Sequence, residues 1–314
     1  MFLDRFQRAL STFDPAAHRW AVIPLRNPHG PITQRRPSSH PTDAVGKQSL
    51  SLASWNVHGS RSNGVTCSKL IINHILQGPP FPDIIHLQEV TDDIRQSLLQ
   101  DPRVRSEYLT TDAEDDMSFK GRPFATMTLL SNKRFGSPLG AADEDEGLGR
   151  KRLGLDNVFR MQLPCRYQRD ALCVDIVSPA APGAVFRLLN IHLDPSDALY
   201  RRYLQMRHLA GLLSEPGSSG GIIAGDFSAT LPEGPGFVDT WGHLVGWGTR
   251  QETTSPDGRG ATSAGVGGEL QAGKLDRVAT LNLKPDEIEI LQPCFIASNK
   301  SWSDDYGLRC SFTI

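Results

Sequence analysis

The chain has 314 residues, of which 39% are hydrophobic and 22% charged, and its formal net charge is -2. This length and composition fit one large α/β domain and argue against a second full domain. A dedicated duplex-binding protein normally carries a strongly basic face, so any nucleic-acid binding would have to come from local patches.

The chain lacks an apolar run of about 18 residues, which excludes a membrane-spanning helix at the sequence level. No apolar stretch typical of a secretory signal opens it, so we expect an intracellular protein of the nucleus or cytoplasm. Its five cysteines are odd in number and lack C-x-x-C spacing, which favours buried reduced thiols over disulfides or a zinc site.

Residues 1–24 form a first, amphipathic segment. Apolar residues alternate there with Asp4, Arg5 and Arg8, which predicts an amphipathic helix over 1–13. An arginine-bearing targeting peptide is the alternative, and the acidic residues count against it. Residues 25–48 are rich in Pro and Arg and read as a loop or disordered lead, so we expect the main domain at 49–314.

Short apolar runs then predict strands at 50–57, 84–87, 124–130, 171–176, 186–193, 221–224 and 276–281. Several are continuous tracts, as in strands buried on both faces of a sheet. Helical patterns lie between them at 68–76, 91–99 and 196–213, and surface loops are expected at 141–149 and 253–273. This order predicts a four-layer α/β sandwich, in which two packed mixed β-sheets are flanked by helices.

Polar residues gather at the ends of these strands, where layered α/β proteins build their sites. The segments concerned are 54–59, 87–89, 190–193, 225–229, 274–278 and 303–308. Taken singly, each residue has an ordinary structural explanation: Glu89 as a helix cap, Asp226 as a turn former and His192 as a buried core histidine.

In this order, however, the six segments resemble the motif set of the endonuclease/exonuclease/phosphatase superfamily. The sequences WN-x-x-G, LQEV, HL-x-x-S, AGD, VDTW, LDRV and SD-x-x-GL-x-C are similar to those of the 5′-tyrosyl-DNA phosphodiesterase branch, from about Ser49 onward. The resemblance implies a DNA-repair hydrolase that uses Mg²⁺, with Mn²⁺ as an alternative ion. Its substrate would be the phosphodiester between a topoisomerase tyrosine and a DNA 5′ end.

The chemistry of phosphodiester hydrolysis assigns roles to these residues. Mg²⁺ prefers oxygen ligands, so Glu89 is the natural metal ligand and Asn56 can assist it without adding charge. Asp226 could orient or deprotonate the attacking water, and His192 could donate to a non-bridging oxygen. Asp276 and Asp304 are expected to support neighbouring side chains.

Three positions depart from the family pattern. Asp305 stands where a Ser-Asp-His motif would place a histidine that donates to the phosphate, and His58 stands where WN-x-D-G would place an aspartate. Ser228 replaces an asparagine that would help to position water. A carboxylate in place of a phosphate donor exchanges attraction for repulsion, at roughly 4 kcal/mol for charges about 4 Å apart.

Two explanations stay open. His58 and Asp305 could have exchanged roles across the site, which requires their side chains to lie close, or the chain could be a pseudo-enzyme that binds without turnover. Retained activity is favoured because the expected residues survive at five positions: Asn56, Glu89, His192, Asp226 and Asp304. The enzyme alternatives are a phosphatase acting on a lipid or inositol phosphate, and a general nuclease of the same superfamily.

Overall fold

The computed structural model describes residues 4–25, 48–59, 62–136, 152–177, 184–195, 198–227, 238–239, 276–297, 300–303 and 305–314. Ser228, Asp304 and the two predicted loops at 141–149 and 253–273 lie outside these residues, as does the lead from 26 to 47. Asp276 is described through its backbone alone.

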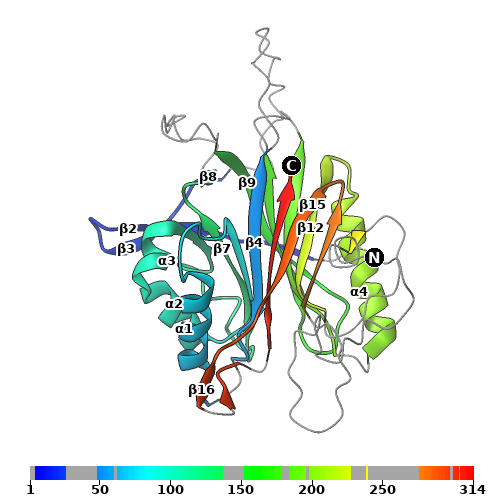
Figure 1. Ribbon diagram of the computed structural model, residues 1–314. Helices are drawn as coiled ribbons and strands as arrows, with labels where there is room; N and C mark the ends of the chain where they lie inside the picture. Colours follow the sequence, from blue (N-terminus) through cyan, green and yellow to red (C-terminus); the bar gives the residue numbers. More distant parts are fainter. Residues whose placement is uncertain are drawn as a thin grey trace.

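Two mixed β-sheets form the centre of the fold (Figure 1). Sheet A runs in the order β1 (Arg5–Gln7), β9 (Leu153–Gln162), β10 (Asp170–Val177), β11 (Val185–His192), β12 (Ser218–Asp226), β14 (Asp276–Leu281) and β13 (Val238–Asp239), with β8 (Phe135–Gly136) beside β9. Sheet B runs in the order β15 (Lys284–Leu291), β18 (Gly307–Thr313), β4 (Ser49–Asn56), β5 (Ile84–Val90), β7 (Ala125–Ser131), β6 (Tyr108–Thr111), β2 (Leu10–Asp14) and β3 (Arg19–Val22). A separate small hairpin joins β16 (Phe295–Ala297) and β17 (Lys300–Ser301).

Helices cover the outer faces of both sheets, as Figure 1 shows. On one side lie α1 (Gly64–Ile75), α2 (Asp92–Gln100) and α3 (Pro102–Glu107), and on the other lies α4 (Leu199–Leu213). Among the described helices, none combines the length and the apolar character that crossing a membrane requires.

Three apolar clusters correspond to the three interfaces between these layers. In β4, Leu50 and Leu52 belong to the cluster between the sheets, whereas Ala53 and Trp55 belong to the cluster under α1 and α2. The residues alternate because successive side chains of a strand point to opposite faces. Both faces of the strand are therefore buried, and the predicted four-layer sandwich of two mixed sheets is confirmed.

The predicted N-terminal helix over residues 1–13 is wrong. In the described part of this segment, Arg5 pairs with Met161 in sheet A and Leu10 pairs with Thr111 in sheet B. Alternation of apolar and charged residues has a period of two, which also fits a strand at a sheet edge, and pairing with existing strands decides the outcome. The described part of this segment thus contributes β1 to sheet A and β2 and β3 to sheet B.

Candidate active site

Four polar side chains meet where two pairs of parallel strands end. Asn56 ends β4 and lies in register with Gln88 of β5, the residue before Glu89. His192 and Asp226 end β11 and β12 and lie directly in register with each other. Parallel strands end at the same edge of a sheet, and the two sheets are packed face to face. Each sheet therefore supplies two of the four side chains.

Close backbone contacts set the positions of both acids. Gly225 has φ 142°, and a Cβ there would lie 2.1 Å from the carbonyl oxygen of Ile191, so only glycine lets β12 approach β11 just before Asp226. A Cβ on Gly59 would lie 2.1 Å from the carbonyl oxygen of Glu89, to which the Gly59 N–H donates a hydrogen bond. Glu89 itself has φ 54°, in the sparsely populated left-handed region. Such strain in a non-glycine residue is typical of functional positions.

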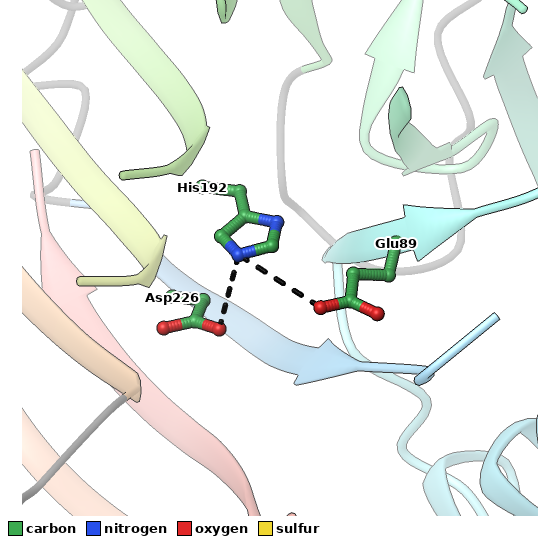
Figure 2. Close-up of side chains that lie close together, drawn as sticks. All are labelled: Glu89, His192 and Asp226. Atoms are coloured by element: carbon green, nitrogen blue, oxygen red, sulfur yellow. Dashed lines mark ion pairs between the residues drawn. The ribbon is translucent and has the colours of Figure 1, made fainter. Parts of the chain in front are cut away.

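Glu89, His192 and Asp226 point toward one another (Figure 2). One potential ligand atom from each lies within 4.8 Å of the others, so the three could share a metal ion. His192 Nε2 lies 3.4 Å from Asp226 Oδ2 and 3.9 Å from Glu89 Oε1. The predicted convergence of Glu89 and Asp226 is thus present in the structure.

Asn56 holds the two acids together. Its Nδ2 donates to Asp226 Oδ2 at 2.8 Å and to Glu89 Oε1 at 3.2 Å, while its Oδ1 accepts from the His58 N–H at 2.9 Å. Only this orientation of the amide satisfies all three contacts, because a carboxylate can only accept. Asn56 is fully buried, so one neutral side chain fixes the positions of the two carboxylates.

Arg169 fixes the tautomer of His192. Its Nη1 lies 2.9 Å from His192 Nδ1, and a guanidinium can only donate, so Nδ1 accepts and the proton of the neutral ring sits on Nε2. Burial lowers the pKa of His192, although Asp226 acts in the opposite direction. His192 therefore presents an N–H donor toward the space beside Asp226. This geometry suits a contact to a phosphoryl oxygen better than metal ligation through Nε2.

A buried amide pair ties the two sheets together directly behind the site. Gln88 Nε2 donates to Asn190 Oδ1 at 2.9 Å. Asn190, on sheet A, donates in turn to the carbonyl oxygens of Leu87 and Met127 on sheet B. Because these contacts connect β11 to β5 and β7, they hold His192 at a fixed position relative to Glu89.

His58 and Asp305 form an ion pair between His58 Nδ1 and Asp305 Oδ2. The Asp305 side chain is 6% exposed and that of His58 is 30% exposed. Burial raises the pKa of Asp305, the His58 contact lowers it, and Asp226 and Glu89 raise it further. The side-chain proximity that an exchange of roles requires is therefore met.

The residues present fit a divalent cation. The carboxylates of Glu89 and Asp226 both accept a hydrogen bond from the Asn56 amide nitrogen. Asp305 lies close enough for both carboxylates to raise its pKa. Arg169 contributes one positive charge at this edge, and burial lowers its own pKa. Hard oxygen ligands with excess negative charge are what Mg²⁺ and Mn²⁺ prefer. Glu89 would supply such a ligand, Asp226 lies beside it, and Asn56 orients both.

A pocket opens beside His192. It is lined by Arg122, Phe124, Tyr167 and Arg169, among other residues. The Phe124 ring stacks on His192 with centroids 5.7 Å apart, and the Arg169 guanidinium lies 5.3 Å from the Phe124 centroid. Tyr167 is 43% exposed at the rim. The pocket thus combines positive charge with aromatic surface next to the acids.

The structure brings together six of the sequence-predicted site residues: Asn56, His58, Glu89, His192, Asp226 and Asp305. The backbone of Asp276 pairs with Asp226 across β14 and β12, whereas Ser228 and Asp304 are outside the described residues. Their roles stay predictions. Sequence reasoning missed Arg169, whose only signal was its place two residues before a predicted strand.

The chain matches the model of the Endonuclease/Exonuclease/phosphatase family over residues 53–261, which is more than half of its length. No curated protein sequence matches it.

Solved structures share its fold at low identity. D. rerio TDP2 complexed with single-stranded DNA product has a TM-score of 0.61 at 18% identity, covering 84% of this chain and 98% of its own. Caenorhabditis elegans TDP2 has a TM-score of 0.58 at 18% identity, covering 85% of this chain and 75% of its own. The human Nocturnin catalytic domain with bound sulfate has a TM-score of 0.53 at 16% identity, covering 86% and 97%.

Proposed function

Because this chain belongs to the endonuclease/exonuclease/phosphatase family, we propose that it is a Mg²⁺-dependent phosphodiesterase acting on DNA 5′ ends that carry a tyrosyl adduct. One observation carries the proposal: Asn56, Glu89, His192 and Asp226 meet at one edge of the two sheets. Two acids and a neutral N–H donor in this arrangement suit a phosphate ester and the water that attacks it.

The reaction is a hydrolysis in which Asp226 accepts a proton from water and the water oxygen forms a bond to phosphorus. The bond from phosphorus to the tyrosyl oxygen breaks, and that oxygen keeps the electron pair and is protonated from solvent. His192 Nε2–H donates to a non-bridging oxygen as negative charge develops there. A cation held by Glu89 would neutralise negative charge on the phosphoryl group. The products are a 5′-phosphorylated DNA end and a free tyrosyl group.

Two features support an aromatic, nucleic-acid-linked substrate over a small phosphate ester. At the rim of the pocket beside His192, Tyr167 offers a ring that is 43% exposed, and Arg122, paired with Asp170, adds a cation; the Phe124 ring already contacts His192 and Arg169. Aromatic rings and bases stack on such surfaces, and cations attract the phosphate backbone. The TDP2 structure from D. rerio contains a single-stranded DNA product, so the same fold accommodates DNA in that protein.

The test is cleavage of a 5′-phosphotyrosyl oligonucleotide in the presence of Mg²⁺ or with EDTA. We expect Mg²⁺-dependent release of a 5′-phosphorylated oligonucleotide. Glu89→Gln should abolish it and weaken Mg²⁺ binding measured by calorimetry. The matched control is Glu287→Gln, the same chemical change at an exposed position on β15, which should leave both unchanged.

Cleavage assays with other substrates, and a binding assay, distinguish the proposed function from the competing ones. Cleavage of an unmodified oligonucleotide at a comparable rate would indicate a general nuclease, and hydrolysis of an inositol phosphate would indicate a phosphatase. Tight binding of the 5′-phosphotyrosyl oligonucleotide without cleavage would indicate a pseudo-enzyme. Each of these results would contradict the proposed function.

A further inference from the structure

A series of hydrogen bonds begins in the N-terminal segment, residues 4–25. This segment lies outside the part of the chain that matches the family model, yet β1 pairs with a strand of sheet A and β2 with a strand of sheet B. Arg8 lies between β1 and β2, and its Nε donates to Ser118 Oγ at 3.2 Å. The Ser118 hydroxyl donates in turn to Asp112 Oδ1 at 2.7 Å. The N-terminal segment is thereby bonded to the connection between β6 and β7.

Arg160 of β9 continues these contacts across the two sheets. Its Nη2 donates to Asp112 Oδ2 and its Nη1 to Asp170 Oδ1, both at 2.9 Å. The two nitrogens also donate to the hydroxyl and carbonyl oxygens of Thr126 on β7. Asp170 Oδ2 accepts from Arg122 Nη1 at 2.7 Å. The complete network comprises Arg8, Ser118, Asp112, Arg160, Asp170 and Arg122.

The network ends in the pocket beside the candidate active site. Residues 122–126 lead into β7 of sheet B, residues 167–170 lead into β10 of sheet A, and both sets line the pocket. Thr126 belongs to the first set and Asp170 to the second, and both are bonded to the Arg160 guanidinium. Arg160 therefore fixes the position of one set of lining residues relative to the other.

Stability is a weak explanation for this buried cluster of charges. The side chains of Arg160 and Asp112 are 2% and 0% exposed. Burial lowers the pKa of Arg160, but its two carboxylate partners outweigh that effect, so the guanidinium stays charged. Its Nε is buried without a hydrogen-bond partner among the described residues, which costs free energy. Apolar residues in place of a buried ion cluster are often neutral or stabilising, so a fixed geometry at the pocket explains the cluster better.

We propose that Arg8, Arg160 and Asp170 are positioning residues that hold Arg122 in the pocket, so that the N-terminal segment contributes to the affinity for the 5′ end of the DNA substrate. This inference rests on the proposed function and adds to it a contribution from outside the matched family region. Arg122 lines the pocket with its side chain 28% exposed, and its Nη1 also donates to the Gln168 carbonyl oxygen at 3.4 Å. An arginine held in one orientation loses less side-chain entropy when it binds an anion.

A double-mutant cycle between the two ends of the network tests this coupling. The measured quantity is the affinity for a 5′-phosphorylated oligonucleotide with Mg²⁺, for the natural chain, Arg8→Ala, Arg122→Ala and the double variant. Arg8→Ala should weaken binding about fivefold in the natural chain but less than about twofold in the Arg122→Ala background, because Arg8 acts through Arg122. Arg19→Ala, the same change at an exposed position of β3, is the control and should leave the affinity unchanged.

Ser118→Ala provides a second route to the same link, since it removes only the hydroxyl group that joins Arg8 to Asp112. It should weaken binding to the same extent as Arg8→Ala, and the variant that combines both changes should bind no more weakly than either. Circular dichroism at the assay temperature establishes that each variant is folded. Additive losses for Arg8→Ala and Arg122→Ala, an unchanged affinity in folded Arg8→Ala, or no measurable binding by the natural chain would overturn the proposal.

Cleavage kinetics separate this inference from the proposed function. Arg8→Ala should raise KM for the 5′-phosphotyrosyl oligonucleotide about fivefold and leave kcat within about twofold, because Arg8 touches no reacting group. A purely structural role for Arg8 would lower stability without changing KM of the folded protein. If the natural chain binds the 5′-phosphorylated oligonucleotide but cleaves no adduct, the proposed function fails and the binding cycle still decides on the network. Normal cleavage with additive binding losses overturns the inference alone.

Discussion

Replacing Asn56 with aspartate should exchange the neutral amide that donates to Glu89 and Asp226 for a third carboxylate. The Asn56 amide nitrogen lies 2.8 Å from Asp226 Oδ2 and 3.2 Å from Glu89 Oε1. An ionised Asn56→Asp side chain would place like charges at these separations. At about 3 Å and an effective dielectric of 20, each repulsion would cost about 5–6 kcal/mol.

Proton uptake limits this cost. A protonated carboxyl group can still donate one of the two hydrogen bonds, and holding it protonated at pH 7 against a normal pKa of about 3.9 costs about 4 kcal/mol. This is less than the sum of two repulsions, so the folded variant should retain the proton and its pKa should be raised. The free energy of unfolding at pH 7 should therefore fall by about 4 kcal/mol.

The sign of the pH dependence follows from that raised pKa. Below about pH 4 the new carboxyl group is protonated in both folded and unfolded states, and as pH rises the unfolded chain loses the proton first. The variant should lose about 1.4 kcal/mol relative to the natural chain for each pH unit above 4. A divalent cation should stabilise Asn56→Asp more than the natural chain, since a third carboxylate favours the cation.

Urea denaturation at pH 4 to 8, with EDTA or with Mg²⁺, measures these effects. Asn132→Asp is the control, because the Asn132 amide makes a single surface hydrogen bond to the Ser106 carbonyl oxygen. If the free energy of unfolding of Asn56→Asp at pH 7 in EDTA is within about 1 kcal/mol of that of the natural chain, the Asn56 amide does not hold Glu89 and Asp226 together. A pH-independent loss would equally contradict the charge argument.

Two further predictions concern the sheets behind the site. Asn190→Ala should lower the free energy of unfolding by roughly 3 kcal/mol or more in urea denaturation. The substitution removes the acceptor of the Gln88 amide and the donor to two buried carbonyl groups. A loss below about 1 kcal/mol would contradict the role of Asn190 in joining the sheets. Burial lowers the pKa of His86 to about 3, so the folded state resists its protonation and stability is lost as pH falls from 6.5 toward 3. His86→Leu should make this loss about 1.4 kcal/mol per pH unit shallower, and an unchanged slope would show that His86 is accessible to protons.

The sequence was most informative where burial leaves few options. The apolar tracts predicted β4, β5, β11 and β12, and the predicted strand at 276–281 coincides with β14 (Asp276–Leu281). The predicted helix at 196–213 contains α4 (Leu199–Leu213) and ends at the same residue. Strands that face two apolar layers need continuous apolar sequence, and this requirement is visible without coordinates.

Edge strands were harder to predict because their pattern depends on partners. The N-terminal segment alternates in a way that fits either a helix or a strand, and its pairing with β9 and β6 decides between them. The β15 strand alternates exposed acids such as Glu287 and Glu289 with partly buried isoleucines, yet it was not identified. Half-exposed strands resemble polar surface segments unless the neighbouring strand is known.

The candidate site shows the same division between what sequence and coordinates contribute. Motif order could gather Asn56, Glu89 and Asp226 into one hypothesis, because strand ends of the same direction share an edge. It could not reveal Arg169, whose contact with His192 depends on the position of β10 relative to β11. Side-chain protonation and tautomers follow from such contacts, so the direction in which His192 donates is a property of the fold.

The same limit applies to His58 and Asp305. Read separately, each position is a substitution that weakens the site, since one removes an acid and the other removes a phosphate donor. Their side chains are in direct contact, so the effect of either residue on the site depends on the other. If the two groups compensate each other, the site keeps both a histidine and a carboxylate, whereas independent decay gives no reason for the complementary residues to lie in contact. Pairwise contact is therefore the information needed to distinguish an altered catalytic site from a lost one.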